Sequence, residues 1–290
     1  MDETRILITG ADGQLGKALQ ARYPKAIAAN RTSLDITDWD ALQQYGWSEV
    51  GVIINAAAYT KVDAAETPEG REAAWKVNAQ AVGYLAKIAA EHDIVLVHVS
   101  SDYVFDGTKS PHTEDEPLTP LNVYGQSKAA GDIAAAVAPK HYILRTSWVV
   151  GDGANFVRTM IGLAQKNISP AVVADQIGRL TFTSTLAEAI AHLLEHQAAY
   201  GTYNVSNDGQ PASWADITRA IFKELGRGDL TVTDTTTKDY FADKPGAAPR
   251  PLRSELDLGK IKATGLTLRD WCDDLHEYIK AEQSKEKEQV

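Results

Sequence analysis

ILITGADGQLGKAL, residues 6–19, joins a short apolar run to a helical pattern through Gly10, Gly13 and Gly16. Glycines at this spacing permit a tight turn and let the backbone approach a pyrophosphate, which the free N–H groups at the helix start then bind. The glycine pattern alone is weak evidence, because close packing of a helix on a strand also needs small residues. Here a strand precedes it and a helix follows it, so the stretch predicts a dinucleotide-binding βα turn.

The rest of the first half repeats this alternation of short β-branched runs and longer helical patterns. Strands are predicted at RILITG, AIAAN, VIINAA, IVLVHVS and YILRTSW, and helices over 15–23, 38–45, 71–92 and 123–137. Repeated βαβ units have right-handed crossovers and place their strands parallel. We therefore predict an α/β fold of the Rossmann type, with a doubly wound parallel sheet.

After Trp148 the pattern becomes less regular. We predict a loop and then a helix within 151–167, strands in PAVVADQ and GTYNVSND, helices over 184–197, 217–225 and 268–281, and an irregular stretch over 233–251. The expected dinucleotide-binding domain spans 1–150 and about 171–207. A smaller substrate-binding domain takes about 151–170 and 208–282, and the charged tail 283–290 is expected to fray.

Composition restricts the class of protein. The 290 residues carry 29 Lys and Arg against 39 Asp and Glu, a net charge of −10, which disfavours nucleic acid and anionic membranes as partners. An anionic small molecule then needs a local cluster of donors. No apolar stretch has the length of a membrane span, the N-terminus does not have the pattern of a signal peptide, and there is one cysteine, Cys272. We expect a soluble cytoplasmic protein.

Tyr124 and Lys128 lie four residues apart at the start of an alanine-rich helical pattern. At this spacing both side chains share one helix face, and an ammonium near a phenol favours the tyrosinate. We therefore expect Lys128 to lower the pKa of Tyr124, making it a general acid or base. Tyr240 and Lys244 repeat the spacing in a polar segment that ends at a proline, so spacing alone does not identify a site.

The end of the second predicted strand bears on the choice of cofactor. An acidic residue about 20 positions past the first glycine would bind the adenosine ribose of NAD. The chain has Asn30 and Arg31 there instead. Arg31 is suited to a 2′-phosphate, so we expect NADPH, with NADH left open as a second donor.

Several stretches together resemble the extended short-chain dehydrogenase/reductases, and among them the dTDP-4-dehydrorhamnose reductase family. They are the glycine turn, NAAAYT at 55–60, VSSDYVFDG at 99–107, Tyr124 with Lys128, RTSWVVG at 145–151, DQIGRLT at 175–181 and RPLRSEL at 250–256. The resemblance implies an NAD(P)H-dependent oxidoreductase that reduces C4 of dTDP-4-dehydro-L-rhamnose to give dTDP-L-rhamnose for cell-surface polysaccharide.

The resemblance also assigns roles to single residues. It implies that Tyr124 donates the proton, that Lys128 holds the nicotinamide ribose and tunes Tyr124, and that Ser101 polarises the ketone. Asp102, Trp148 and Arg250 are the implied substrate contacts, with Arg250 on the diphosphate. The implied cofactor contacts, beside the glycines and Lys128, are Gln14, Leu15, Asn30, Arg31, Asp35, Ile36, Ala57, Ala58 and Tyr59.

Two features argue against a metal site. Some members of the family are dimers bridged by Mg²⁺ between glutamates, whereas this chain has Ala18 and Ser184 at the corresponding positions. We therefore expect a monomer without metal. HLLEH at 192–196 matches a zinc-binding pattern, but its leucines suit a core helix and no further carboxylate ligand suggests itself. Asn78 is expected either to support a proton relay to Lys128 or to lie on a helix surface.

Two other functions remain open. A nucleotide-sugar epimerase or dehydratase of the same superfamily would keep the glycine turn and the Tyr-Lys pair, although Asp102-Tyr103 lacks the Asp-Glu pair of the dehydratases. A non-catalytic regulator is the second, because the β subunit of methionine adenosyltransferase resembles this family. The intact set of Tyr124, Lys128 and Ser101 weighs against a regulator.

Overall fold

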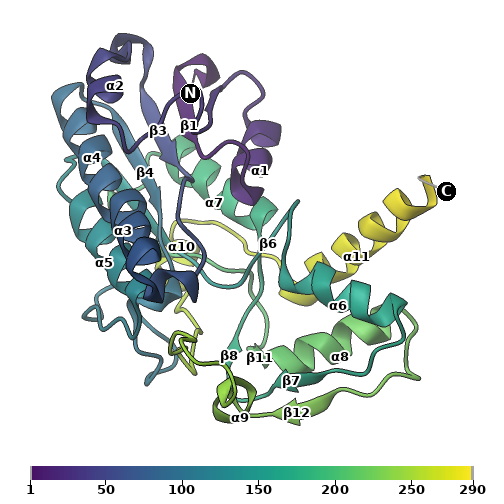
Figure 1. The fold of residues 1–290 in the computed structure, drawn as a ribbon. Coiled ribbons are helices and arrows are strands. Elements are labelled where there is room, and N and C mark those ends of the chain that lie inside the picture. The colour runs from purple at the N-terminus through teal and green to yellow at the C-terminus, as the bar shows by residue number, and fades with distance from the viewer. Residues whose placement is uncertain (1, 289–290) are drawn as a thin grey trace.

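The computed structural model describes residues 2–288 and contains a six-stranded parallel sheet covered by helices on both faces (Figure 1). The strand order is β10-β5-β4-β3-β1-β2. The strands are β1 (Ile6–Thr9), β2 (Ile27–Ala29), β3 (Val52–Asn55), β4 (Val95–Val99), β5 (His141–Arg145) and β10 (Gly201–Asn204). The predicted α/β class and the six strands of this sheet are confirmed.

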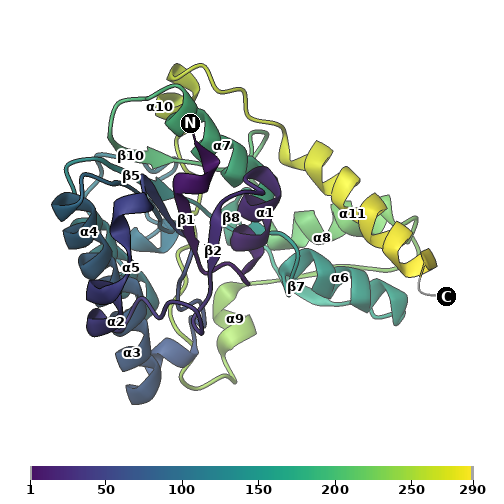
Figure 2. The same cartoon turned by 90° about the horizontal axis from the view of Figure 1, so that it is seen from above.

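Each face of the sheet buries its own apolar cluster. Helices α1 (Gln14–Arg22) and α7 (Thr183–Glu195) pack on one face, where Leu19 and Leu186 are fully buried. Helices α2 (Trp39–Gln44), α4 (Ala81–Glu91) and α5 (Val123–Ala135) pack on the other. Figure 2 shows the two helix layers from above. Both faces are thus closed to water, as a parallel sheet requires.

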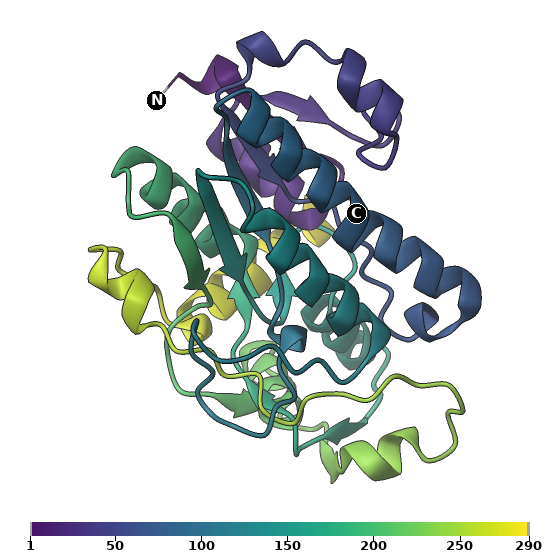
Figure 3. The ribbon, with the colours of Figure 1, turned by 90° about the vertical axis from the view of Figure 1, so that its left-hand side faces the viewer.

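The helix predicted over 71–92 is longer and less regular than expected. It begins as α3 (Pro68–Trp75), passes through a π-helical turn at Lys76–Gln80, and continues as α4. Figure 3 shows this long helix beside α5. The π turn brings Asn78 into the interior, where it is 1% exposed, so the surface location considered for Asn78 is wrong.

The second half of the chain adds a smaller layer with a separate apolar cluster (Figure 1). Its helices are α6 (Phe156–Gln165), α8 (Trp214–Glu224), the short α9 (Thr237–Phe241) and α11 (Trp271–Glu288). The short helix α10 (Gly259–Ala263) returns to the large sheet, where Ile261 joins the same cluster as Leu19 and Leu186. Its strand pairs are β6 (Val149–Val150) with β9 (Thr181–Phe182), β7 (Ala171–Val173) with β12 (Thr233–Thr235), and β8 (Ile177–Gly178) with β11 (Ala212–Ser213).

Two expectations for the second half need correction, and one strand that forms as predicted has a partner that the sequence did not indicate. The strand in PAVVADQ forms as β7, but it pairs with β12 outside the large sheet. The stretch 233–251, expected to be irregular, contains β12 and α9. Helix α11 extends to Glu288 instead of ending at 281, so the described part of the tail is helical, and 289–290 lie outside the described residues. The division into two domains stays a prediction.

In the described part of the chain, no helix combines the length and apolarity that crossing a bilayer demands.

Candidate active site

A cavity of about 640 Å³ lies at the carboxyl ends of β1, β3, β4 and β5. The β1–β3 boundary is where the chain reverses direction across the sheet, the usual ligand site of doubly wound folds. Four connecting segments line the cavity. They contribute Asp12–Leu15 after β1, Ala56 and Ala58 after β3, Val99–Tyr103 at the end of β4, and Thr146–Trp148 after β5.

The turn after β1 has room only for glycine at two of its three glycine positions. Gly10 has φ +69°, and a Cβ there would lie 2.6 Å from the Ala57 nitrogen. A Cβ on Gly16 would lie 2.2 Å from the Gly10 carbonyl oxygen. Helix α1 begins at Gln14 with Gly13 as its N-cap, and no side chain caps it. Its first N–H groups are therefore free for an anion, and this cradle fits a dinucleotide pyrophosphate.

The other residues expected at the pyrophosphate and nicotinamide end lie around this turn. Leu15 and Ala58 line the cavity, and Gln14 lines it while its Oε1 accepts a 2.9 Å hydrogen bond from the Gly151 N–H. Ala57 and Tyr59 flank Ala58 without lining the cavity. Two hydrogen bonds from Asn78 hold the Tyr59 backbone, one accepted from its N–H at 2.8 Å and one donated to its carbonyl at 3.0 Å.

The residues expected at the adenosine end form a separate loop after β2. The Asn30 side chain accepts hydrogen bonds from the N–H groups of Thr32 and Ser33 and so shapes this loop. The Arg31 side chain is 88% exposed, and its Nε lies 3.4 Å from Asp35 Oδ2. Ile36 is buried beneath them. None of Asn30, Arg31, Asp35 and Ile36 lines the cavity.

Tyr124 and Lys128 both face the cavity from α5, as their spacing predicts. The expectation for the Tyr124 pKa is wrong, because burial raises it to about 12, opposed in part by hydrogen bonding to Ser101. Lys128 is not among the groups that shift the pKa of Tyr124. Its Nζ donates a hydrogen bond to the Val99 carbonyl oxygen at 2.6 Å, and burial lowers the pKa of Lys128 to about 8.

Ser101 and Asp102 follow β4 and also line the cavity. The Ser101 hydroxyl donates to Asp102 Oδ1 at 3.0 Å and accepts from the Tyr103 N–H at 3.2 Å. Burial raises the pKa of Asp102 to about 6, although Ser254 and Ser101 lower it by hydrogen bonding. The half-buried Tyr124 phenol, the buried Ser101 hydroxyl and the buried Asp102 carboxyl thus line the same cavity.

The two substrate residues expected farther along the chain differ in position. Trp148 lines the cavity with φ +47°, and its ring stacks on Trp214 with centroids 3.7 Å apart. Arg250 does not line it. Its Nη2 is 2.7 Å from Asp63 Oδ1, its Nη1 donates to the Ala248 carbonyl, and only 12% of its side chain is exposed.

A glycine turn with a free helix N-terminus and a Tyr-Lys pair on one cavity is the arrangement of a nucleotide-dependent reductase. A family model for the RmlD substrate binding domain matches residues 4–284. The chain belongs to this family.

Relatives agree with membership in the RmlD substrate binding domain family. A dTDP-4-dehydrorhamnose reductase of Aggregatibacter actinomycetemcomitans is 42% identical, covering 92% of this chain and 95% of the relative. A structure of that name from Clostridium acetobutylicum has a TM-score of 0.89 at 37% identity, covering 96% and 99% of the two chains. Another, from Bacillus anthracis in complex with NADP, has a TM-score of 0.87 at 35% identity, with the same coverage.

The cavity of this RmlD-family chain also contains residues that sequence reasoning missed. Among them are Lys17, Asp152 and Gly153 near the glycine turn and Thr146 after β5. Thr146 Oγ1 is one of the buried polar atoms without a hydrogen-bond partner within 2–288, which suits a polar ligand. Lys17 directly follows the glycine pattern and was detectable. Asp152 lies in a loop that no pattern marks.

The other patterns considered have structural contacts. His192 Nε2 pairs with the Thr264 carbonyl oxygen at 3.0 Å, His196 Nδ1 pairs with the His192 carbonyl oxygen, and Glu195 pairs with Arg22 at 2.6 Å. Within residues 2–288 no group of three His, Cys, Asp or Glu side chains is arranged to hold a metal. The Lys244 Nζ lies 3.3 Å from the Tyr240 ring centroid, a cation–π contact on the surface.

Proposed function

We propose that this chain is an NADPH-dependent reductase that converts the C4 ketone of dTDP-4-dehydro-L-rhamnose to the alcohol of dTDP-L-rhamnose, a precursor of cell-surface polysaccharide. The observation that carries the proposal is the single cavity shared by the glycine turn, Ser101, Tyr124 and Lys128. The names of the relatives support the substrate, and the NADP complex of the Bacillus anthracis relative supports the cofactor.

The residues of the chain suit the reduction direction. NADPH, when bound, supplies the hydride that reaches C4. Because its pKa is raised to about 12, the Tyr124 phenol is protonated at neutral pH. It can therefore donate its hydroxyl proton to the ketone oxygen. Ser101 stands beside Tyr124 as a second hydroxyl for the same oxygen. The free N–H groups of the glycine turn would hold the pyrophosphate, and Lys128 the nicotinamide ribose.

The proposed substrate contacts lie partly inside and partly outside the cavity lining. Asp102 and Trp148 line the cavity and are proposed to contact the sugar and pack on the substrate. Arg250 is bound to Asp63 outside the cavity lining, so for Arg250 to bind the diphosphate its side chain must leave this carboxylate. Arg31 remains the proposed partner of a 2′-phosphate.

The decisive experiment is an NADPH-oxidation assay of the purified protein against dTDP-4-keto sugars that differ at C3, C5 or C6, with product configuration read by NMR. We expect turnover with dTDP-4-dehydro-L-rhamnose and dTDP-L-rhamnose as product. Stoichiometric NAD in the isolated protein would favour an epimerase. No turnover on any sugar, together with recovery of a methionine adenosyltransferase at stoichiometric level, would favour the regulator.

We also propose a cytoplasmic monomer without metal. Ala18 packs partly buried on the core and Ser184 is exposed, so neither of these two positions offers a carboxylate for a bridging cation. Reducing conditions suit the one cysteine, Cys272. Light scattering with and without Mg²⁺ tests the monomer, and a dimer that forms only with Mg²⁺ would contradict it.

A further inference from the structure

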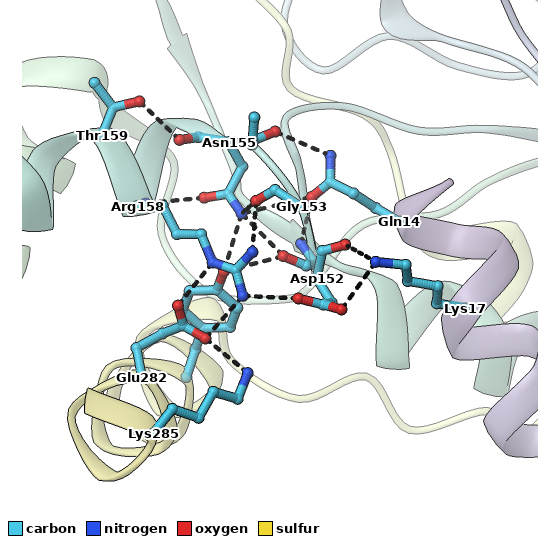
Figure 4. Close-up of polar contacts among 12 residues, drawn as sticks. Gln14, Lys17, Asp152, Gly153, Asn155, Arg158, Thr159, Glu282 and Lys285 are labelled. Carbon is cyan, nitrogen blue, oxygen red and sulfur yellow. Dashed lines mark hydrogen bonds and ion pairs between the residues drawn. The ribbon is translucent and has the colours of Figure 1, made fainter. Parts of the chain in front are cut away.

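The loop 151–155 lies between the glycine turn and helix α11, as the polar contacts in Figure 4 show. On one side it contacts Gln14, the first residue of α1. Gln14 Oε1 accepts from the Gly151 N–H at 2.9 Å, and its Nε2 donates to the Ala154 carbonyl oxygen at 3.3 Å. A Cβ on Gly153 would lie 2.9 Å from Gln14 Cγ, so the loop presses closely on this side chain.

On its other side the loop is fixed by Tyr278, from the middle of α11. The Tyr278 hydroxyl donates to the Gly151 carbonyl oxygen at 3.0 Å and accepts from Asn155 Nδ2 at 3.0 Å. Asn155 also caps helix α6, because its Oδ1 accepts from the Arg158 N–H. The backbone of Gly151 thus receives contacts from Gln14 and from Tyr278 at the same time.

A charged pair strengthens this connection one turn farther along α11. Arg158 donates to both carboxylate oxygens of Glu282, from Nε at 2.7 Å and from Nη2 at 2.9 Å. The same guanidinium donates to Asp152 Oδ1 and to the Gly153 carbonyl oxygen, both at 2.9 Å. Bidentate pairs of this kind fix orientation as well as distance.

The pair is ionised and partly shielded from water. The Arg158 and Glu282 side chains are 28% and 15% exposed. Hydrogen bonding from Arg158 lowers the pKa of Glu282, and hydrogen bonds from Arg158 and Lys17 lower that of Asp152 to about 2. Lys17, in the first turns of α1, holds Asp152 Oδ2 at 3.0 Å. The contacts therefore run from α11 through the loop to α1 without a gap.

We propose that Arg158, Tyr278 and Glu282 form a brace through which the C-terminal helix positions the glycine turn for the cofactor. This inference rests on the proposed function, because it assumes that the turn binds NADPH. Binding of a pyrophosphate depends on the direction of the first N–H groups of α1, and Gln14 begins that helix. The brace residues act through the loop and are positioning residues for cofactor affinity.

Two variants and one matched control test the brace. Glu282→Gln keeps the shape of the side chain and removes its charge. Tyr278→Phe removes the hydroxyl and keeps the ring that packs near Phe182 at 5.7 Å, so it is the variant least expected to disturb folding. Glu277→Gln is the control, because Glu277 also pairs with an arginine of this chain, Arg269, at 2.8 Å, but is 64% exposed and away from the loop.

We expect both brace variants to raise the Kd of NADPH by roughly 2- to 30-fold, the range of residues coupled to a site through a contact network. Their KM for NADPH should change more than kcat or the KM for the sugar, and Glu277→Gln should match the wild type. Quenching of tryptophan fluorescence and thermal unfolding, run together, separate affinity from stability.

Wild-type NADPH affinity in both brace variants would overturn the brace while leaving the proposed function intact. An equal loss of NADPH affinity in Glu277→Gln would also overturn the brace, since a general effect of charge on α11 would then explain the change. Failure of the wild-type protein to bind NADPH at all would overturn both proposals.

Discussion

The ammonium group of Lys128 donates a 2.6 Å hydrogen bond to the carbonyl oxygen of Val99, the last residue of β4. The bond fixes the cation at the carboxyl edge of the sheet, in the wall of the cavity that Tyr124 also lines. Tyr124 remains a phenol of high pKa because it is buried. In a reduction a protonated phenol is the form required at the start, so this arrangement suits proton donation.

Replacing Lys128 tests its role in cofactor binding. Lys128→Met removes a charge-assisted hydrogen bond, which implies about 1.5 to 3 kcal/mol, or roughly a 10- to 150-fold rise in the Kd of NADPH. Burial lowers the pKa of Lys128 to about 8, so wild-type affinity should fall as pH rises through about 8, where the ammonium loses its proton. NADPH titrations across this range should show no such fall in the variant. Unchanged affinity would leave Lys128 with only its bond to Val99.

Removing the Tyr124 hydroxyl tests the proton donor. Tyr124→Phe should lower kcat by about 10² to 10⁴ while the Kd of NADPH changes little, because the ring remains and only the transferred proton is lost. Tyr240→Phe, in the surface pair of the same spacing, should behave as wild type in the same assay. If Tyr124→Phe retained more than about a tenth of kcat, another acid such as Asp102 would have to supply the proton.

The sequence predicted those parts of the site that depend on local pattern. The glycine turn, the strands of the large sheet and the common face of Tyr124 and Lys128 all follow from short spacings, and carboxyl ends of parallel strands necessarily meet. The pKa of Tyr124 was not predictable, because it depends on burial by residues from several elements. Arg250 and Asp63 pair across 187 positions, and no local signal indicates such a contact.

The same limit applies to the pairing of the strand in PAVVADQ, which forms as predicted. PAVVADQ has the composition of a buried strand, and composition does not say which strand it pairs with. Its partner β12 lies about 60 residues farther on, in a polar stretch that reads as irregular. The loop 151–155 was predicted, but its contacts were missed for a similar reason, since they come from Gln14 and from Tyr278 in the middle of α11.

The buried Asp102 predicts a pH dependence of stability. Burial raises its pKa to about 6, so between about pH 4 and pH 6 the folded state binds more protons at this group than the unfolded state. Its contribution to the free energy of unfolding should therefore decrease as pH rises through that window. Denaturant unfolding of Asp102→Asn at several pH values should lack this decrease, and the difference from wild type is the measured quantity.

Asp106 is a matched control of opposite sign. Hydrogen bonds from Thr108 lower the pKa of Asp106, so its contribution is present above the unfolded pKa and is lost as pH falls through the folded value. Asp106→Asn should remove a contribution to the free energy of unfolding that grows with pH. Asp102→Asn should remove a contribution that declines with pH. If the free energies of unfolding of the two variants differed from the wild type in the same way across the pH range, the burial assigned to Asp102 would be contradicted.

Arg31 should set the preference between NADPH and NADH. Its side chain is 88% exposed, so its contact with a 2′-phosphate is screened and contributes up to about 1 kcal/mol, or up to about fivefold in affinity. Arg31→Ala should raise the KM of NADPH by about this factor and leave that of NADH unchanged. Lys25→Ala, at the amino end of β2, removes an equal charge far from the carboxyl edge and should change neither. A higher wild-type kcat/KM for NADH than for NADPH would defeat the argument for a 2′-phosphate contact.

Gly10 and Gly226 allow backbone strain to be separated from steric overlap. Both have φ near +70°, but a Cβ on Gly10 would lie 2.6 Å from the Ala57 nitrogen, whereas one on Gly226 would meet nothing within 4 Å. Gly226→Ala should cost only the left-handed conformation, about 1 to 2 kcal/mol of unfolding free energy. Gly10→Ala adds an overlap with backbone of about 1 to 3 kcal/mol more, and it should also abolish measurable NADPH binding because the turn must shift. Denaturant unfolding and NADPH titration of both variants measure the two effects. Equal stabilities with NADPH binding retained in both would show that the turn after β1 tolerates a side chain, and the pyrophosphate cradle would then have to lie elsewhere in the cavity.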